Sequence, residues 1–313
     1  MKNRTIGHEA RTHRWGYIFI LPFVIAFFIF SFWPIVTTFT LSFQQIKGRG
    51  SSEDFTFINF TNLIKDPFFW DALKNTFIIW GFNFIPQLGL ALVLSIWLSD
   101  AQLNLAGKGF FRAVVYMPNL LTAASVAFLF RSLFGYDQGN LNAPVHQFLR
   151  LFEIAPVDYF RSALFSRGLV AFIQWWMWYG HTLILLMAGI TSIPTSLFES
   201  ATVDGANGRQ TAWYITLPLL RPIMLFILVT SMIGGMQMFD IPFLLTNRTG
   251  APGTSIRTTV MYQYNIAFMG NSDLSYGAAV SIGVFIVTII LAALIFFFLQ
   301  DRTDLKKAKG GGK

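Results

Sequence analysis

The chain has 313 residues, of which 54% are hydrophobic, 17% aromatic and only 12% charged, and its formal net charge is +8. Soluble domains carry about 25% charged residues, so a chain this apolar lacks the polar surface that a water-soluble domain needs. The absence of cysteine excludes a disulfide framework, a thiolate metal site and a cysteine nucleophile.

Runs without Asp, Glu, Lys or Arg mark the candidate membrane spans. About 20 mostly apolar helical residues cross a bilayer, and a charge at the centre costs about 2.5–3.5 kcal/mol, so charges mark the ends. Six uncharged runs reach 18 residues: Trp15–Ile46, Asn75–Ser99, Ala113–Phe130, Gly168–Phe198, Pro222–Phe239 and Leu274–Gln300. Each run is expected to hold one helix. This pattern predicts an all-α, polytopic membrane protein with six transmembrane helices.

The first run has a second interpretation, a cleaved signal peptide. Arg11 and Arg14 precede the apolar stretch Tyr17–Phe32, as they would in a signal sequence. The apolar stretch continues to Phe43 without an A-x-A-like cleavage site, which makes it too long for a signal peptide. We therefore interpret it as a retained helix.

The distribution of Lys and Arg predicts that the N- and C-termini are both cytoplasmic. With the N-terminus inside, the inner segments hold 13 of the 23 basic residues, and the longer outer loops count for less. These 13 are Lys2, Arg4, Arg11, Arg14, Lys108, Arg112, Arg209, Arg221, Arg302, Lys306, Lys307, Lys309 and Lys313. The positive charge then reflects topology and contact with anionic membrane lipid. No basic patch alternates with aromatic residues outside the spans, so no nucleic-acid partner is expected.

The connecting segments suggest one membrane domain. We expect a cytoplasmic N-terminus at 1–14, a six-helix transmembrane domain at 15–300 and a cytoplasmic tail at 301–313. The second outer loop contains two short amphipathic stretches, around Val145–Phe152 and Asp158–Phe165, which predict helices lying on the membrane surface. The third outer loop, Asp240–Asp273, contains a Gly/Pro turn signal.

Polar side chains gather on one face of three spans. Gln174, Trp178 and His181 stand at i, i+4 and i+7 in span four, with Met177 beside them. Polar groups in a bilayer usually face a bundle interior or a cavity, although Trp and Tyr are also enriched in interfacial belts. The belt and cavity interpretations both stay open for Trp175 and Trp176. No second histidine or carboxylate is spaced with His181, so no metal site is expected.

Spans five and two carry weaker signals of the same kind. Ser231, Gly234 and Met238 share a face of span five, with Gln237 beside them. Small residues at this spacing serve close helix packing or leave room for a transported solute. In span two, Asn83 and Gln87 lie one turn apart, and this amide pair could bind a solute or only a neighbouring helix.

The inner loop at about 191–221 reads as a helix, a turn and a second helix. Ser196 and Glu199 fit a capping box, and Asp204-Gly205 should end the first helix because glycine tolerates the left-handed conformation. Asn207 and Gln210 form a second cap-like pair, and Pro218 and Pro222 bracket the entry to span five. Taken one at a time, Glu199 and Gly205 could simply cap and turn a helix.

The whole loop, however, resembles the E-A-A-x-x-x-G-x₉-I-x-L-P loop of binding-protein-dependent ABC importer permeases. The matching positions are Glu199, Ala201, Asp204, Gly205, Ala206, Ile215, Leu217 and Pro218, while Ser200 replaces the usual alanine. The resemblance implies the ABC importer permease fold and a short helix that docks on a dimer of separate ABC ATPase subunits. The chain has no G-x-x-x-x-G-K-[ST] loop, so we expect ATP and magnesium to bind those subunits and this chain not to be an enzyme.

The order of Leu186–Pro194, Phe243–Thr246 and Thr258–Phe268 is similar to the maltose, glycerol-phosphate and multiple-sugar permeases. This resemblance implies a place in the bacterial cytoplasmic (inner) membrane, a second homologous permease subunit, an extracellular solute-binding protein and a carbohydrate cargo, expected to be an oligosaccharide. It also implies that Gln174, Trp178 and His181 line the sugar path.

Two other functions fit the sequence less well. A passive channel or an ion-coupled carrier for a polar solute would also need several spans and a polar interior, but such carriers usually bear ionisable residues within their spans, and the six runs contain none except histidine. A membrane-embedded enzyme would need paired carboxylates, a His/Ser set or a metal cluster near one membrane face, and the sequence has none of these.

Overall fold

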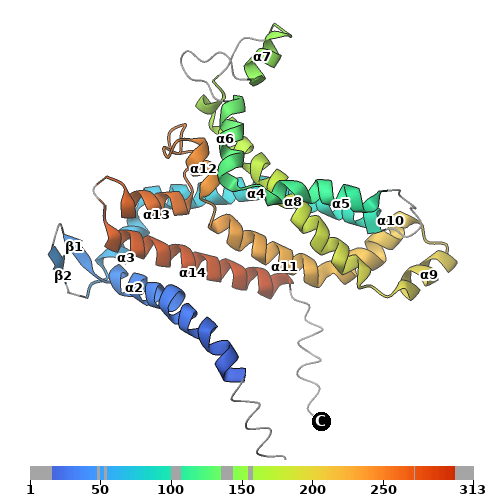
Figure 1. The fold of residues 1–313 in the computed structure, drawn as a ribbon, viewed down its shortest axis with the longest axis horizontal. Coiled ribbons are helices and arrows are strands. Elements are labelled where there is room, and N and C mark those ends of the chain that lie inside the picture. The colour runs from blue at the N-terminus through green and yellow to red at the C-terminus, as the bar shows by residue number, and fades with distance from the viewer. Residues whose placement is uncertain are drawn as a thin grey trace, which may run out of the picture. The chain divides into compact units, whose positions relative to one another are not determined.

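The computed structural model describes residues 16–47, 50–52, 55–99, 107–134, 144–153, 158–270 and 272–299. The expected terminal segments 1–14 and 301–313 lie outside the described residues. The chain forms two compact units, one made of Met1–Asp66 and Gln263–Gly283 and the other of Pro67–Tyr262 and Val284–Lys313. Figure 1 labels the helices and strands of both.

The first unit begins with an apolar helix, Gly16–Ser42, whose middle part, η1 (Phe28–Phe32), is π-helical and whose last part is α2 (Trp33–Ser42). A short antiparallel hairpin follows, with β1 at Gln45–Lys47 and β2 at Gly50–Ser52, and then α3 at Ile58–Lys65. The buried Asn59 amide donates to the carbonyl oxygens of Ser42 (3.0 Å) and Gln44 (2.8 Å), which fixes α3 against the end of α2. The fold is all-α apart from this hairpin.

The second unit contains most of the helices. They are α4 (Pro67–Ser99), α5 (Lys108–Tyr116), η2 (Met117–Leu120), α6 (Ala123–Phe134), α7 (Pro144–Arg150), η3 (Tyr159–Arg161), α8 (Ala163–Thr191), α9 (Thr195–Val203), α10 (Gly208–Thr211), η4 (Ala212–Thr216), α11 (Leu217–Met236) and α12 (Asp240–Leu245). The chain crosses between the two units within α13 (Thr259–Phe268) and within α14 (Leu274–Leu299).

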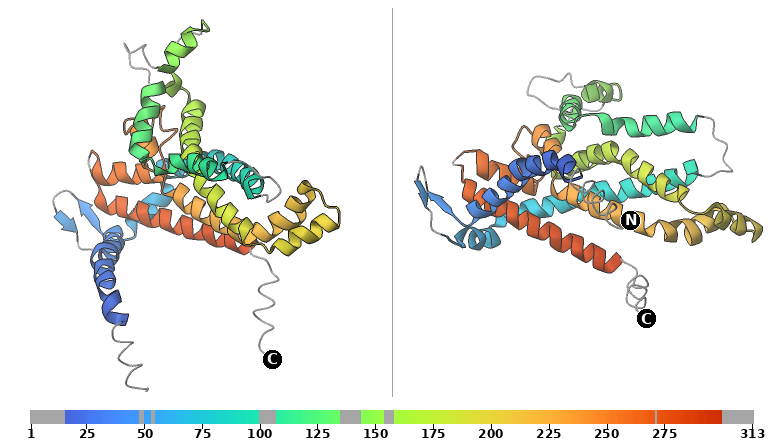
Figure 2. Two further views of the ribbon diagram at one scale, coloured as in Figure 1. Left: turned by 45° about the vertical axis from the view of Figure 1, so that its right-hand side comes forward. Right: turned by 60° about the horizontal axis from the view of Figure 1, so that its bottom comes forward.

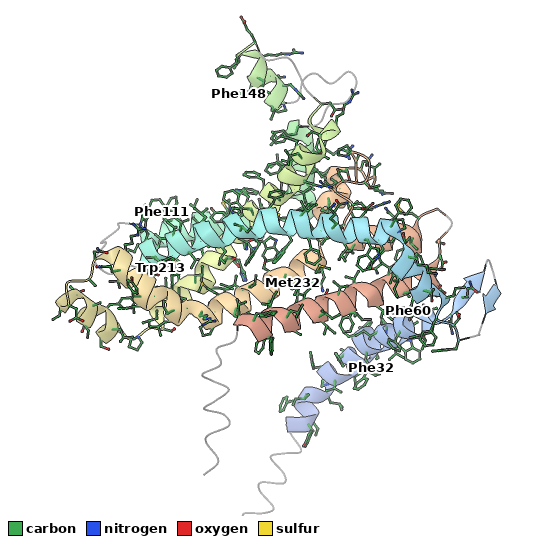
Figure 3. The ribbon with its side chains drawn as sticks, turned by 180° about the vertical axis from the view of Figure 1, so that it is seen from behind. Phe32, Phe60, Phe111, Phe148, Trp213 and Met232 are labelled. Atoms are coloured by element: carbon green, nitrogen blue, oxygen red, sulfur yellow. The ribbon has the colours of Figure 1, made fainter. Side chains whose placement is uncertain are left out.

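The core of the second unit lies where α4, α8 and α11 pack together. Ile79 of α4, Leu183 of α8 and Leu220 of α11 are fully or almost fully buried. In the side-chain view of Figure 3, Met232 lies among the helices, whereas Phe111 and Trp213 project from the outer surface. Apolar residues on the outside of a helical bundle are what a lipid solvent requires.

The six predicted spans agree with the helices, with one correction. Among the described residues, five helices are long and apolar enough to cross a membrane, and a bent pair makes a sixth if its two helices form one span. The expectation of a single helix in Ala113–Phe130 was wrong, because Lys108–Leu120 and Ala123–Phe134 meet at 88°. Pro118 has no N–H to donate to a continuing helix. The side chain of the next residue, Asn119, donates to the carbonyl of Met177 in α8 (3.3 Å).

The second outer loop also differs in part from the prediction. The stretch around Val145–Phe152 does form a helix, α7 (Pro144–Arg150). The stretch Asp158–Phe165 does not form a helix of its own, because the single turn η3 leads directly into α8. Ser162 caps α8 by accepting from the Phe165 N–H (3.3 Å), so the second half of the stretch is already the first turn of that long helix.

Glycine at position 180 allows α8 and α5 to touch. A Cβ atom on Gly180 would overlap the carbonyl oxygen of Val115 and lie 2.9 Å from its carbonyl carbon, which is backbone that cannot move aside locally. We expect Gly180→Ala to destabilise the protein by about 1–3 kcal/mol, the usual cost of overpacking. Thermal unfolding of the detergent-solubilised protein measures this loss.

Gly168 of the same helix provides the control for that experiment. A Cβ atom there meets no atom within 4 Å, so Gly168→Ala should leave the unfolding temperature unchanged or slightly raised. Equal unfolding temperatures for the two variants would contradict the close approach of α8 and α5.

Candidate functional site

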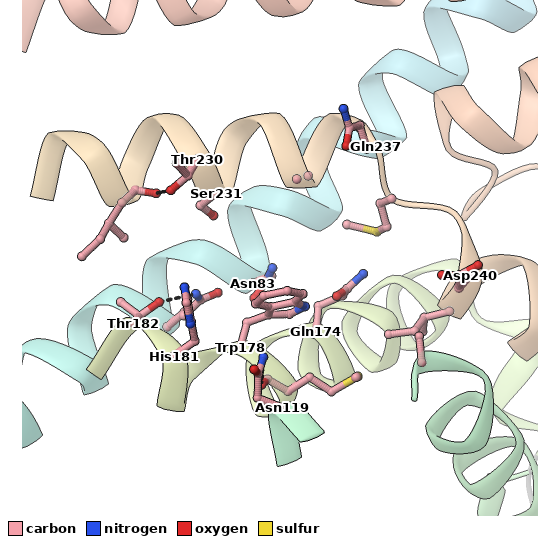
Figure 4. A pocket seen from close by; sticks show the side chains of 18 of the residues that line it. Asn83, Asn119, Gln174, Trp178, His181, Thr182, Thr230, Ser231, Gln237 and Asp240 are labelled. Atoms are coloured by element: carbon pink, nitrogen blue, oxygen red, sulfur yellow. Dashed lines mark hydrogen bonds between the residues drawn. The ribbon is translucent and has the colours of Figure 1, made fainter. Parts of the chain in front are cut away.

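A cavity of about 430 Å³ lies between α4, α8 and α11, with η2, the start of α6 and the start of α12 at its edge. Figure 4 shows it from close by. All ten residues that the sequence analysis placed on a substrate path line this cavity. They are Asn83, Gln87, Gln174, Met177, Trp178, His181, Ser231, Gly234, Gln237 and Met238. Side chains from three spans that are far apart in the sequence therefore meet in one place.

The face of α8 provides the aromatic part of the cavity. Trp178 remains 46% exposed, and its ring lies 6.0 Å from the His181 ring at an interplanar angle of 90°. In Figure 4, both rings point toward the Thr230–Ser231 side of α11. The two neighbouring tryptophans point elsewhere: Trp176 packs against a buried core cluster, and Trp175 stacks on Tyr179 and lines a separate apolar groove. Only Trp178 of the three belongs to this cavity.

The two amide side chains of α4, Asn83 and Gln87, have different roles. The Gln87 side chain donates to the Thr182 hydroxyl of α8 (2.7 Å), so it ties two helices together. The Oδ1 atom of Asn83 is buried and accepts no hydrogen bond from the described residues. A buried oxygen without a donor costs about 1–3 kcal/mol, so this atom is available to a hydroxyl that enters the cavity.

The small residues of α11 also divide into two roles. Ser231 accepts a hydrogen bond from the indole N–H of Trp80 (3.2 Å), and a Cβ on Gly235 would overlap the same ring. These two positions make room for Trp80, as the packing interpretation predicts. A Cβ on Gly234, in contrast, would meet nothing within 4 Å, and Gly234 is exposed on the cavity side.

Helix α11 ends beside the cavity. Residues 237–239 are not helical, and α12 begins at Asp240. The carbonyl oxygen of Met238 accepts from the Thr258 hydroxyl (2.7 Å), and that of Met236 from the Thr259 hydroxyl (3.4 Å). Irregular backbone at membrane depth is tolerated where it lines a cavity and its polar groups are satisfied, and these hydroxyls satisfy two of them.

The cavity is also lined by four polar residues that the sequence did not indicate. They are Asn119, Thr182, Thr230 and Asp240. Asn119 could have been predicted as a cavity residue from the sequence, because it is the only amide in the run Ala113–Phe130 and follows a proline. Asp240 was taken only as the charge that ends span five. Its place at the cavity edge depends on the chain turning back into α12.

The loop after α8 has the helix–turn–helix form predicted for it. Helix α9 ends in a Schellman motif, in which the Ala206 N–H donates to the Ala201 carbonyl (2.9 Å) and the Gly205 N–H to the Thr202 carbonyl (3.1 Å). Gly205 has a φ of +75°, as its predicted left-handed turn requires. Asn207 and Gln210 form a complete capping box with two 2.9 Å bonds.

Two details of this loop need correction. The capping box at Ser196 and Glu199 does not form, because α9 begins at Thr195 with Pro194 as its N-cap, so Ser196 already lies inside the first turn. Glu199 is exposed. Pro218 and Pro222 do not bracket the entry to span five either, since α10, the π-helical η4 and α11 follow one another directly. Ile215 lies in η4, and Leu217 and Pro218 begin α11.

Known proteins are similar to this chain over most of its length. No family model matches the chain. The lactose transport system permease protein of Rhizobium radiobacter is 30% identical over 288 residues, which cover 92% of this chain and 94% of that protein. The arabinooligosaccharides transport system permease protein of Bacillus subtilis is 29% identical over 281 residues, which cover 89% and 86%. The chain belongs to the sugar ABC transport permeases.

A solved structure shows that the permease also shares their fold. A subunit in the crystal structure of a bacterial ABC transporter that imports the acidic polysaccharide alginate matches it with a TM-score of 0.79 and 21% identity, over 95% of the permease and 98% of that subunit. The apolar helices and these relatives make the permease a multi-pass protein of the inner membrane. The all-α, six-span fold predicted from the sequence is thereby confirmed.

Proposed function

We propose that the permease is one of two pore-forming subunits of an ATP-driven importer, and that its cavity carries a sugar, most simply an oligosaccharide, across the membrane. The observation that supports this proposal is the convergence of hydrogen-bonding side chains from three spans around a half-exposed indole. The cavity volume of about 430 Å³ falls within the range of about 300–1,000 Å³ typical of small-molecule sites.

The chemistry of the cavity suits a sugar. A pyranose ring has an apolar C–H face that packs on an aromatic ring, and Trp178 offers such a ring. Its hydroxyl groups both donate and accept, and Gln174, His181 and Asn83 supply matching groups from two helices. Each such neutral hydrogen bond contributes about 0.5–1.5 kcal/mol, which is enough for recognition and weak enough for release.

The loop containing α9 is proposed to receive the work of ATP hydrolysis. Glu199, Ser200 and Asp204 are exposed on it, as expected of a short helix that docks in a groove of another protein. Helix α9 follows α8 and leads through α10 into α11. Figures 1 and 2 show it at the end of these two helices that lies away from α12. A push on α9 would therefore move two walls of the cavity.

The assembly follows from these roles. A second permease subunit completes the path, a pair of ATPase subunits binds ATP and magnesium and docks on α9, and an extracellular binding protein delivers the sugar. This arrangement places α9 and both chain termini in the cytoplasm. A solved neighbour is described in complex with an alginate pentasaccharide-bound periplasmic protein, and it matches the permease with a TM-score of 0.76.

Reconstitution into vesicles tests the proposal. The purified permease alone should move no labelled oligosaccharide, with or without ATP, because it has a coupling loop but no ATPase. Addition of its second permease, the ATPase pair and the binding protein should produce uptake that stops when ATP is withheld. ATP-independent sugar flux through the permease alone would favour the passive channel or ion-coupled carrier instead.

A further inference from the structure

The described residues that line the cavity include a negatively charged side chain and no positively charged Lys or Arg. None of the described residues that line it is Lys or Arg, and Asp240 is the only carboxylate among them. The other polar lining residues are amides, hydroxyls, one indole and one imidazole. The wall that this chain contributes therefore holds a negative charge and many neutral hydrogen-bonding groups.

Two basic side chains on neighbouring elements are directed elsewhere. Arg131 of α6 donates to the carbonyl of Leu244 (3.4 Å), near the end of α12. The guanidinium of Arg248 lies 5.9 Å from the centre of the Phe243 ring. Neither residue lines the cavity. Within the part of the chain that the structure describes, the ion pair present joins Arg161 to Asp158, so no described cation neutralises Asp240.

We propose that this cavity selects uncharged carbohydrate over carbohydrate that bears a carboxylate, and that Asp240 is the residue that determines this specificity. The inference rests on the proposed function and narrows its substrate class. An anion that leaves water for a site between apolar helices loses its hydration and needs a positive partner. Here it would meet the carboxylate of Asp240, which is exposed at the edge of the cavity, and two like charges repel.

The fold itself does not decide this property. The alginate importer has the same fold and is described as carrying an acidic polysaccharide. Sugar charge must therefore be read from the side chains that line the path. In Figure 4, Asp240 lies at the α12 end of the cavity, while Thr230, Ser231 and His181 lie toward its other end. A sugar that fills the cavity would bring one of its rings toward Asp240.

Matched neutral and acidic sugars test the proposal. The probes are lactose, arabinotriose and maltotriose, each paired with the same sugar in which a primary hydroxyl is oxidised to a carboxylate. Their affinities for the assembled transporter in lipid nanodiscs are measured by saturation-transfer NMR, without the binding protein, so that its own preference does not enter. The assay runs at about pH 8.

The expected result is an acidic form that binds at least about tenfold more weakly than its neutral parent, which corresponds to about 1.4 kcal/mol. Asp240→Asn should reduce this ratio at least about threefold, and Asp240→Glu, which keeps the charge, should preserve it. Asp158→Asn removes a carboxylate outside the cavity and should leave the ratio unchanged. Asp158→Asn thus controls for net charge.

The outcomes separate this inference from the function on which it rests. Equal affinity for neutral and acidic forms, or a ratio that Asp240→Asn does not change, overturns the charge selection but leaves sugar transport intact. If none of the six sugars binds and none is taken up by reconstituted vesicles, the proposed function itself is wrong. The comparison within the unmodified transporter needs no variant, so a poorly folding Asp240→Asn would not prevent a decision.

Discussion

Replacement of Trp178 by alanine should lower sugar uptake by the assembled transporter about tenfold or more. The indole is half-exposed in the cavity and offers a broad aromatic face on which a sugar ring can pack. Loss of an aromatic contact of this size costs about 1.5–3 kcal/mol, and each 1.4 kcal/mol is a factor of about ten. Initial rates of labelled oligosaccharide uptake into proteoliposomes measure the effect.

A matched tryptophan outside the cavity controls for general damage. Trp97 of α4 is 62% exposed and does not line the cavity, so Trp97→Ala removes the same side chain from an exposed position outside the cavity. Its uptake rate should stay close to that of the unmodified protein. Binding of sugar to the external binding protein should be the same in both variants. If Trp178→Ala and Trp97→Ala transport equally well, Trp178 belongs to an interfacial belt and not to a sugar path.

Gly205→Val should reduce cargo-stimulated ATP hydrolysis and sugar uptake together, by about tenfold. The φ of +75° at Gly205 is sterically unfavourable for any residue with a Cβ, by about 1–2 kcal/mol, and is worst for β-branched residues. A Cβ at this position would meet no atom within 4 Å, so the cost is one of backbone conformation alone. The Schellman turn would open, and α9 would no longer be presented in its docking orientation.

Asparagine at the same position separates this backbone effect from loss of the glycine itself. Asn enters the left-handed region more readily than other residues, so Gly205→Asn should keep most of the ATP hydrolysis and uptake. Both variants should insert into the membrane and reach normal levels, as immunoblots of membrane fractions would show. Full coupling in Gly205→Val would mean that the turn after α9 has no part in transmitting force.

The sequence by itself determined the spans and much of the loop that contains α9. A bilayer tolerates few charges and requires a minimum helix length, so the uncharged runs indicate where the helices lie. Helix α14, for example, lies within one residue of its predicted run at each end. The turn at Gly205 and the cap at Asn207 were equally predictable, because caps and Schellman motifs involve only residues close in sequence.

The sequence also found one face of the cavity, because a helical period identifies residues that point the same way. The period could not say which of three adjacent tryptophans would meet the cavity. Only the packing of α4 and α11 against α8 places Trp178 in it and directs Trp175 and Trp176 elsewhere. The same packing gave Gln87 a partner in Thr182 and left the Asn83 oxygen without one.

The breaks in the helices were decided by tertiary structure. The 88° bend in the run Ala113–Phe130 was not predicted, and the Asn119 side chain at this bend donates to the Met177 carbonyl of another helix. Asp240 looked like an ordinary boundary charge until α12 turned back beside the cavity. Local signals therefore fix what depends on neighbours along the chain and on the lipid solvent. Bends, unpaired polar atoms and the charge of the path depend on hydrogen bonds and contacts between residues far apart in sequence, and only the packed structure supplies these.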